Sequence, residues 1–595
     1  MRYFALFLTS LVLLTVQPTL AQADTLSSGF ATSEELVANG GFESWVDNQP
    51  SAWDFWIVGD EKSKENQGLA LAPSTDAAVG ERAALLQGIG EADTWIILNQ
   101  NIPVESGSIF HFSGMLRGLD VLSPTGRRWQ CQIGIIARSA QGQRINQWLL
   151  KPAPGTTDWY SDSRIIQAPP GCASFDLQVV TNGKGRLLVD EVSLRPTRIR
   201  GGMKSGLSGA EKRRADLEYL TTTLPMLHIE PFRFTSEAAF DSLAGTIAKE
   251  CDTLSDLDFT FRLMELVASL DDAHTTLEFA VRPPRLPIQY EFFGDDLRVM
   301  LAPKPCADIV GGRVLEIGGK PISDVLGAIR VLIPHETESW IRYRTPRLLR
   351  LMAVAEHLGI VSEDGAIDLV VATDRGDRRQ CRLDLNLDFK RSDFIFAFPA
   401  DKAEPLYLSC WDNYWLKYLP DSKTLYVRGV RCREDKQKPM AGFIDQIDEI
   451  VDTRPIERFV LDLRYNTGGG SGVFRPLIAA VASHRDAGDI GQCYVITGIA
   501  TFSAACLNAQ EFVDKAGALV VGEAMGNRTD RFGQLNEFSL PYSGLRVRYS
   551  TKRFRWGGHD EDMLVPDIPA PLTWQDYSEG RDPAMEAILS DKSRP

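Results

Sequence analysis

Residues 458–470 read Arg-Phe-Val-Leu-Asp-Leu-Arg-Tyr-Asn-Thr-Gly-Gly-Gly. The apolar run at the start of this stretch is typical of a buried strand, and the glycines predict a sharp turn directly after it. Adjacent glycines let backbone N–H groups point at a ligand oxygen. No Gly-Lys-Ser/Thr follows, and the spacing is not Gly-x-Gly-x-x-Gly, so the turn does not resemble a nucleotide-binding loop. The alternative is an ordinary turn between a strand and a helix.

The stretches on both sides alternate between strand-like and helix-like patterns. Short apolar runs are bounded by turn residues, and the segments between them repeat apolar residues at helical spacing. This alternation predicts parallel strands joined by helical crossovers from about residue 391 onward. The predicted strands are 425–430, 458–463, 493–497 and 518–521, and helices are expected around 443–451, 473–483 and 504–516.

Residues 24–197 predict a separate all-β domain, because short alternating runs are separated by Gly, Pro, Asn and Asp turns. Segments 39–43 and 187–194 resemble the first and last strands of jelly-roll carbohydrate-binding modules. The resemblance implies a jelly-roll sandwich similar to galactose- and carbohydrate-binding modules, with aromatic side chains able to stack on sugar rings. The alternative is that its tryptophans fill the core and the domain serves as a spacer or protein-contact module.

Three segments connect these two regions. Residues 198–209 are basic and rich in Gly and Ser, which is typical of a linker. Residues 210–286 carry helical spacing and end in an extended run. Residues 287–390 mix strands and helices, and 311–322 resembles the strand–turn–strand–helix stretch of a PDZ domain. No carboxylate-binding loop of the PDZ kind is evident, so we expect a degenerate PDZ-like α+β unit.

The net charge and the N-terminal residues indicate which partners and which compartment to expect. The 595 residues carry a formal net charge of −15, which argues against a nucleic-acid or anionic-membrane binder. Residues 1–23 have a positive start, an apolar run and small residues before a cleavage point, as a secretory signal does. We therefore expect an exported protein, periplasmic or extracellular. A membrane anchor is the alternative, but the apolar run is short for a membrane span.

The nine cysteines are scattered and form no Cys-x-x-Cys pair, which argues against a zinc site or a thioredoxin-type motif. An oxidising compartment permits disulfides, and Cys131 with Cys172 could pair within the first domain. The odd number leaves at least one thiol free or intermolecular. No metal and no organic cofactor are implied by the sequence.

Ser503 stands in Thr501-Phe502-Ser503-Ala504-Ala505, where a strand and turn give way to a helix. A helix N-terminus presents unpaired amides and a partial positive charge, which would stabilise an oxyanion formed beside the serine. A serine at this position is more often only an N-cap.

Together, these motifs resemble the S41 family of serine peptidases, which includes tail-specific proteases and the tricorn core. The glycine turn and the Ser503 stretch resemble the family's two central blocks, and the order of the blocks agrees. The resemblance covers about residues 210–595 and implies a crotonase/ClpP-like α/β catalytic core over 391–595. The remaining matching stretches are 271–275, 520–523 and 561–568.

The family uses either a Ser–Lys dyad or a Ser–His–Glu set. Arg528 stands at the position of the dyad lysine, and an arginine stays protonated and cannot act as a general base. Lys515 lies twelve residues after Ser503, within the same predicted helix. The resemblance therefore implies Ser503 as the nucleophile, His274 as the general base and Glu561 as the carboxylate.

The residue before His274 is Ala273, where the tricorn-like pattern has a serine, so a relay through that hydroxyl is missing. The resemblance also implies an oxyanion hole formed by the amides of Gly468 or Gly469 and of Ala504. Three alternatives stay open. His274 could be a buried histidine bonded near the preceding aspartates, and His559 could be the base if its loop folds inward. Glu561 could instead belong to a solvated loop, because it stands in the charged run 559–562.

We therefore predict an exported serine peptidase that acts on peptides or protein tails through an acyl-enzyme. The N-terminal domain is expected to hold a glycan or a protein ligand, and no nucleic acid is expected as a partner. The alternatives are a catalytically silent ligand-binding protein on the same fold and a glycan-active protein. The last lacks a paired-carboxylate site in a catalytic domain of its own.

Overall fold

The computed structural model divides the chain into two compact units, residues 1–205 and 206–595. The predicted signal 1–23 and most of the predicted linker 198–209 lie outside the residues that the structure describes, and the predicted domain bounds stay predictions. None of the helices in the described ranges has the length and apolar content needed to span a bilayer. The described residues are 35–58, 70–89, 95–122, 131–150, 156–169, 171–182, 184–196, 206–387, 389–554 and 564–592.

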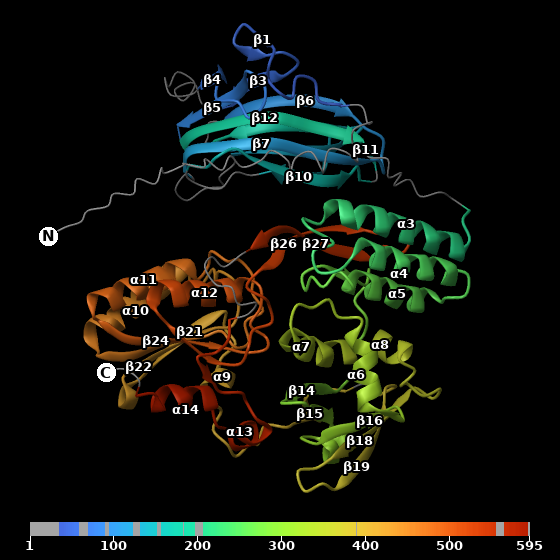
Figure 1. The fold of residues 1–595 in the computed structure, drawn as a ribbon, viewed down its shortest axis with the longest axis vertical. Helices are drawn as coiled ribbons and strands as arrows, with labels where there is room; N and C mark the ends of the chain where they lie inside the picture. Colours follow the sequence, from blue (N-terminus) through green and yellow to red (C-terminus); the bar gives the residue numbers. More distant parts are fainter. Residues whose placement is uncertain are drawn as a thin grey trace, which may run out of the picture. The chain divides into compact units, whose positions relative to one another are not determined.

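The first unit is an antiparallel sandwich of two five-stranded sheets (Figure 1), with strand orders β10-β7-β12-β5-β4 and β3-β6-β11-β8-β9. Buried residues of both sheets, such as Phe112 and Phe175, form one core, so the sheets pack face to face. The predicted all-β region is confirmed. The strands are β1 (Trp45–Val46), β2 (Gln49–Pro50), β3 (Asp54–Val58), β4 (Ala70–Ser74), β5 (Ala83–Ile89), β6 (Trp95–Pro103), β7 (Ile109–Leu122), β8 (Cys131–Ser139), β9 (Arg144–Leu150), β10 (Tyr160–Gln167), β11 (Cys172–Thr181) and β12 (Lys184–Pro196).

The suggested pairing of Cys131 with Cys172 is wrong. The two residues lie at opposite ends of the β8–β11 ladder, where Cys131 faces Thr181 and Cys172 faces Ser139. Both thiols are free and buried. The disulfide joins Cys306 to Cys381 in the second unit, and the other seven cysteines, all among the described residues, are free.

The second unit begins with three helices, α3 (Gly209–Leu227), α4 (Glu237–Glu250) and α5 (Asp256–Ala268). Each begins at a serine N-cap whose side chain accepts a backbone N–H, which satisfies one of the donors that a helix start leaves unpaired. The predicted helical region is thus present. A three-stranded sheet of order β13-β27-β26 follows, made of β13 (Thr276–Glu278), β26 (Arg531–Ser539) and β27 (Arg546–Phe554).

A seven-stranded antiparallel sheet lies in the region where the sequence predicts the PDZ-like unit. Its part from residue 313 to 330 runs strand, turn, strand and helix, as expected, while the PDZ-like assignment itself stays a prediction. The elements are β14 (Gln289–Phe293), β15 (Asp296–Pro303), η1 (Lys304–Ile309), β16 (Arg313–Ile317), β17 (Lys320–Pro321), α6 (Ile322–Arg330), α7 (Glu338–Leu349), α8 (Met352–His357), β18 (Ala366–Ala372), β19 (Arg378–Asp384), η2 (Arg391–Asp393) and β20 (Phe394–Phe396).

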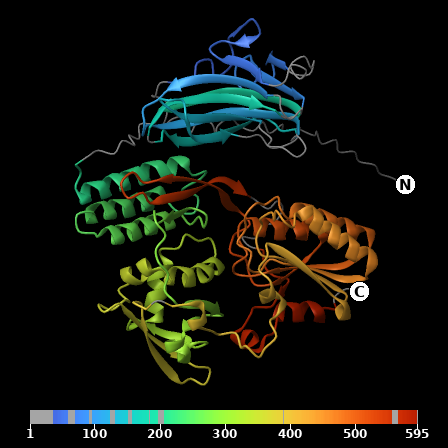
Figure 2. The same ribbon diagram turned by 180° about the vertical axis from the view of Figure 1, so that it is seen from behind.

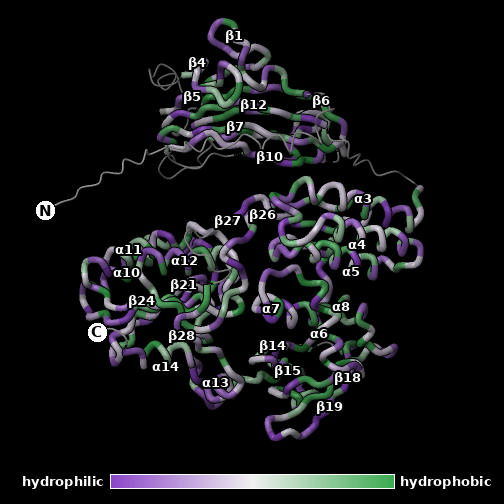
Figure 3. Tube along the Cα trace, in the orientation of Figure 1, coloured by the Kyte–Doolittle hydropathy of each residue, from purple (hydrophilic) through white to green (hydrophobic). Residues whose placement is uncertain are grey.

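A six-stranded sheet of order β21-β22-β23-β24-β25-β28 forms the core of the C-terminal part. Strands β22 to β25 and β28 pair in parallel, as the alternating pattern predicts. One hydrophobic cluster joins α10, α11 and α12 to the sheet, and a second joins α14 to it through other strand residues. Figure 3 shows hydrophobic residues along β24. The crotonase/ClpP-like assignment stays a prediction. The elements are α9 (Leu406–Ser409), β21 (Tyr414–Leu419), η3 (Pro420–Ser422), β22 (Thr424–Gly429), α10 (Met440–Thr453), β23 (Ile456–Asp462), α11 (Arg475–Ala487), β24 (Ile490–Thr497), α12 (Ala504–Ala516), β25 (Leu519–Gly522), β28 (Ile568–Pro569), α13 (Trp574–Glu579) and α14 (Pro583–Ser590).

The β26–β27 hairpin links this core to the helices α3 to α5, and Figures 1 and 2 show it running between them from both sides. Strand β27 pairs with β13, which begins two residues after His274, and the Tyr219 ring of α3 packs edge-on against Phe538 of β26. The hairpin therefore brings the segment that carries His274 to the core that carries Ser503.

Candidate functional site

Ser503 occupies a strained position between β24 and α12. Its φ and ψ are 56° and −122°, a region that residues other than glycine rarely adopt. The turn before it is braced by Thr501, whose hydroxyl donates to the Leu463 carbonyl at 2.8 Å and accepts the Gly498 N–H at 3.0 Å. The Ser503 side chain makes no capping hydrogen bond. The N-cap alternative therefore fails, and the Ser503 hydroxyl is left for another role.

A buried polar chain holds the backbone of Ser503. Its N–H donates to Asn527 Oδ1 at 2.6 Å, and Asn527 Nδ2 donates to Glu336 Oε2 at 2.9 Å. The same carboxylate oxygen accepts the Arg528 N–H at 3.0 Å. Glu336 precedes α7, whose N-cap Thr337 donates its hydroxyl to the Gly526 carbonyl at 3.0 Å. The residues at the start of α7 therefore hold the turn 526–528 in place, and Asn527 in that turn holds the backbone of Ser503.

The glycine turn lies directly against the serine. Gly468 has a φ of 96°, and a Cβ on it would lie 2.7 Å from Ser503 Cβ. The Gly468 N–H donates to Asn466 Oδ1 at 2.9 Å, so this amide is engaged. Within the described part of the chain, the amides of Gly469 and Ala504 have no hydrogen-bond partner; Ala504 opens α12, where backbone donors have no intrahelical acceptor. Two of the three amides predicted for the oxyanion are therefore free.

His274 is brought to the same place. Its ring stacks on that of Phe502, the neighbour of Ser503, with the ring centroids 4.4 Å apart. Its backbone N–H donates to Asp272 Oδ1 at 2.9 Å. The ring is buried, and both ring nitrogens are without a hydrogen-bond partner among the described residues. Burial, assisted by the charge of Arg531 and opposed by that of Asp272, lowers the pKa of His274 to about 4, so the ring is neutral at pH 7.

His274 is hydrogen-bonded to a preceding aspartate, Asp272, as one alternative suggested, but the bond comes from its backbone N–H and not from its ring. Asp272 Oδ2 instead accepts a hydrogen bond from the Thr275 hydroxyl at 2.6 Å and lies 2.8 Å from His228 Nε2. Burial would raise the pKa of Asp272, but the His228 hydrogen bond and the nearby imidazoles lower it to about 2. Asp272 is thus an ionised, fully bonded anchor of the segment 272–275.

Glu336 is a carboxyl group that the sequence does not single out. One oxygen of Glu336, one of Asp272 and one ring nitrogen of His274 lie within 4.8 Å of one another. Glu336 Oε1 is buried without a partner among the described residues. Burial and the charge of Asp272, opposed by the Asn527 amide and the Arg528 N–H, raise the pKa of Glu336 to about 8.

One imidazole and two carboxylates are side chains that can together ligate a metal ion. Here both Asp272 oxygens already accept hydrogen bonds. Among the described residues, the atoms of this group without a hydrogen-bond partner are Glu336 Oε1 and the two ring nitrogens of His274.

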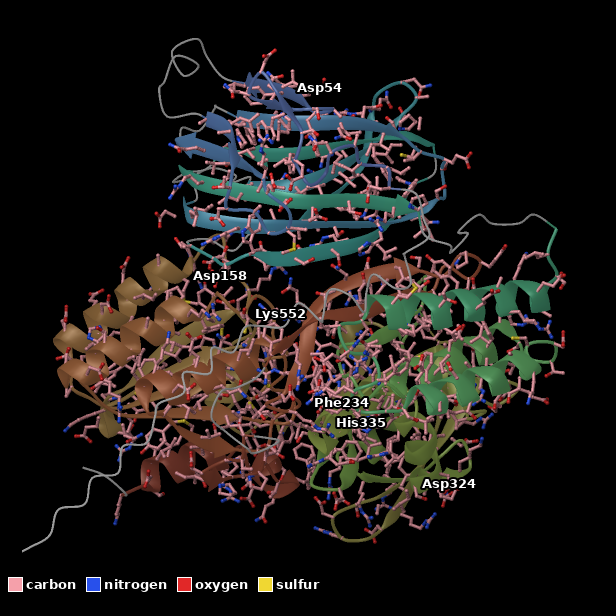
Figure 4. The ribbon with its side chains drawn as sticks, turned by 45° about the horizontal axis from the view of Figure 1, so that its top comes forward. Asp54, Asp158, Phe234, Asp324, His335 and Lys552 are labelled. Atoms are coloured by element: carbon pink, nitrogen blue, oxygen red, sulfur yellow. A yellow bond between two sulfur atoms is a disulfide. The ribbon has the colours of Figure 1, made fainter. Side chains whose placement is uncertain are left out.

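The structure agrees with setting aside Lys515 and Arg528 as the general base. Lys515, in the last turn of α12, pairs with Glu511 at 2.7 Å and is half exposed. Arg528 turns its guanidinium to the Phe234 ring, with 4.9 Å from Cζ to the ring centroid. Figure 4 labels Phe234 and also His335, the residue before Glu336. Glu561 and His559 lie outside the described residues, so their roles stay predictions.

A cavity of about 480 Å³ borders the two turns of the site. Thr467, which precedes the glycines, and residues 498–500, which precede Ser503, line it on the core side. Tyr343 and Arg347 of α7 line it on the other. Ser503 and His274 are not among its lining residues, so the cavity lies next to the site and not over it.

Comparison with known proteins finds no matching family model and no matching curated protein. Among solved structures, the chain is similar to mature CPAF complexed with lactacystin, with 14% identity, a TM-score of 0.49, and coverage of 64% of this chain and 98% of that one. It is also similar to the photosystem II D1 C-terminal processing protease, with 12% identity, a TM-score of 0.32, and coverage of 64% and 97%.

A third similar structure is the family 16 carbohydrate-binding module-2, with 14% identity, a TM-score of 0.20, and coverage of 27% of this chain and 98% of that one. The comparison thus confirms the two resemblances predicted from the sequence, one to S41-family proteases and one to carbohydrate-binding modules. At these sequence identities and TM-scores, the similarities give no evidence for an activity or a substrate of this chain. The chain is similar in structure to S41-family proteases and, over 27% of its length, to a carbohydrate-binding module.

Proposed function

We propose that the chain is an exported serine peptidase in which Ser503 attacks the scissile carbonyl and His274 acts as the general base. The observation that carries the proposal is the strained Ser503, whose hydroxyl caps nothing, which lies against the glycine turn and beside a neutral buried imidazole. A serine nucleophile needs a neutral base and preorganised donors for the oxyanion.

The chemical steps follow from these positions. His274 takes the proton of the Ser503 hydroxyl while Ser503 Oγ forms a bond to the carbonyl carbon, and the oxygen that gains charge is held by the amides of Gly469 and Ala504. His274 then gives the proton to the amine as the C–N bond breaks, leaving an acyl-enzyme. Water repeats the attack with His274 again as the base, which releases the acid and restores Ser503.

Glu336 and Asn527 are positioning residues in this scheme, because they act on Ser503 through its backbone N–H. The carboxylate that the family resemblance assigns, Glu561, is retained as a proposal for orienting His274. Peptides and protein tails are the proposed substrates. For the first unit we retain the proposal of a glycan or protein ligand; Trp56 of its edge strand β3 is exposed.

The test is cleavage of a diverse peptide mixture by the mature protein, with the products read by mass spectrometry. The variants Ser503→Ala and His274→Ala are compared with two matched controls, Ser471→Ala and His484→Ala. Ser471 lies in the same glycine-rich loop, and His484 is on α11, bonded to Asp448. We expect cleavage by the wild type and both controls and none by the two site variants.

Two results would contradict the proposal. Cleavage that survives Ser503→Ala would remove the assigned nucleophile. A wild type that cleaves nothing would favour the ligand-binding alternative on the same fold.

A further inference from the structure

The second unit holds a further cavity, of about 590 Å³, which we call the arginine cavity. Its walls come from α5, β13, the segment after β13, α7 and β27, and none of the proposed catalytic groups lines it. Met264, Leu277, Phe279 and Leu348 give it apolar surface. Its lining also includes six arginines, namely Arg282, Arg285, Arg344, Arg347, Arg350 and Arg546.

The charges in the arginine cavity do not balance. Glu278 is the one carboxylate among its lining residues, all of which are described, and it pairs with Arg546 at 3.0 Å. Arg347 pairs with Glu291, which lies outside the lining, at 3.5 Å. Within the described ranges, Arg344 and Arg350 have no ion pair and no side-chain hydrogen bond; Arg344 lies over the Trp340 ring, with 5.7 Å from Cζ to the ring centroid. The cavity therefore carries an excess of positive charge.

Helix α7 supplies half of these cations from one face. Arg344 and Arg347 are three residues apart, and Arg350 follows three residues later at the C-cap. Residues at this spacing are neighbours on a helix surface, and like charges there destabilise the helix. Cation–π contacts with the Trp340 and Tyr343 rings hold Arg344 and Arg347 in place without supplying a counter-charge.

Burial makes the arrangement more costly. The pKa of Arg344 and that of Arg350 are both lowered, first by burial and also by the charge of Arg347. The Nε atoms of Arg350 and Arg546 are buried donors without an acceptor among the described residues. A buried donor left unpaired destabilises the fold. An anion in the cavity would relieve the like-charge repulsion and supply the missing acceptors.

Accordingly, we propose that the arginine cavity binds a small polyanion of the oligophosphate class. The guanidinium fork matches phosphate oxygens in pairs, and several forks around one volume suit a ligand with several phosphate groups. The volume is that of a small-molecule site, and the exposed Arg282 and Arg285 give it a positive rim. The proposal does not depend on the peptidase function.

Isothermal titration calorimetry of the full chain tests the proposal, with tripolyphosphate, inorganic phosphate and citrate as three separate probes. The variant Arg344→Gln/Arg350→Gln removes the two arginines without a carboxylate partner. The matched control is Arg378→Gln/Arg379→Gln, which removes the same charge from β19, outside the cavity. Melting curves and circular dichroism spectra show whether both variants are folded.

We expect wild type and control to bind tripolyphosphate more tightly than phosphate or citrate, with an affinity that falls as salt is added. The Arg344→Gln/Arg350→Gln variant should bind at least about tenfold more weakly, since it loses two charged hydrogen-bond donors. No binding by the wild type up to about 10 mM, which means a free energy weaker than about −3 kcal/mol, overturns the proposal. Equal affinity of the two double variants, or tighter binding of citrate, overturns it as well.

Discussion

Replacing Gly468 with alanine places a methyl group against the proposed nucleophile. The added Cβ would lie 2.7 Å from Ser503 Cβ, 2.8 Å from the Phe502 carbonyl oxygen and 3.0 Å from the Ala504 nitrogen. None of these atoms is the far end of a flexible side chain. The backbone around Ser503 must therefore move to admit the methyl group.

Two costs add up at this position. An alanine held at the Gly468 φ of 96° is strained by about 1–3 kcal/mol. Overpacking a tight site costs about 1–3 kcal/mol more. Catalysis should suffer beyond stability, because displacing a catalytic group by about 1 Å lowers the rate by about 100-fold, or about 2.7 kcal/mol.

The assay is kcat/KM on a cleaved peptide, together with the melting curve of the full chain. Gly472→Ala is the matched control, because it lies in the same loop and its Cβ would meet nothing within 4 Å. We expect Gly468→Ala to lose at least about 100-fold in kcat/KM and to melt earlier, with Gly472→Ala close to wild type. Wild-type kcat/KM in Gly468→Ala would refute the packing of the glycine turn against Ser503.

Three further outcomes are expected. Glu336 keeps its proton up to about pH 8 in the folded protein, so the unfolding free energy of the wild type should fall as the pH rises from about 4.5 to about 8. Urea titrations at several pH values should show that Glu336→Gln has a flatter dependence of this free energy on pH. Asn527→Ala should cost about 1–3 kcal/mol and lower kcat more than it raises KM, because the Ser503 N–H loses its acceptor. Asp272→Asn should destabilise by about 3–5 kcal/mol near pH 7; the wild-type stabilisation from this carboxylate should disappear between about pH 4 and pH 2, which acid titrations of both proteins would show.

Much of the C-terminal core could be predicted because its pattern is local. The helix 504–516 has the predicted bounds, since apolar spacing marks its length and Gly517 ends it in a left-handed conformation. The parallel strands also follow from alternating strand and helix patterns. The first unit could be predicted as all-β for the same reason.

The polar chain behind Ser503 could not be predicted. Asn527 and Glu336 are 191 positions apart, and a glutamate just before a helix looks like an ordinary acidic residue near a helix start. The sequence offers one sign, because Asn527 stands next to Arg528, the residue at the position of the dyad lysine. The cysteine pairing failed because membership of one domain does not fix register, and Cys131 and Cys172 face other residues across the β8–β11 ladder.

The most direct measurement is covalent labelling by a fluorophosphonate probe, which reacts with activated serine nucleophiles, followed by peptide mapping of the adduct. The account predicts one adduct on Ser503 of the wild type, none in Ser503→Ala, and a much slower reaction in His274→Ala, whose base is missing. A peptide-cleaving wild type without an adduct at Ser503, or one labelled at another serine, would contradict the account.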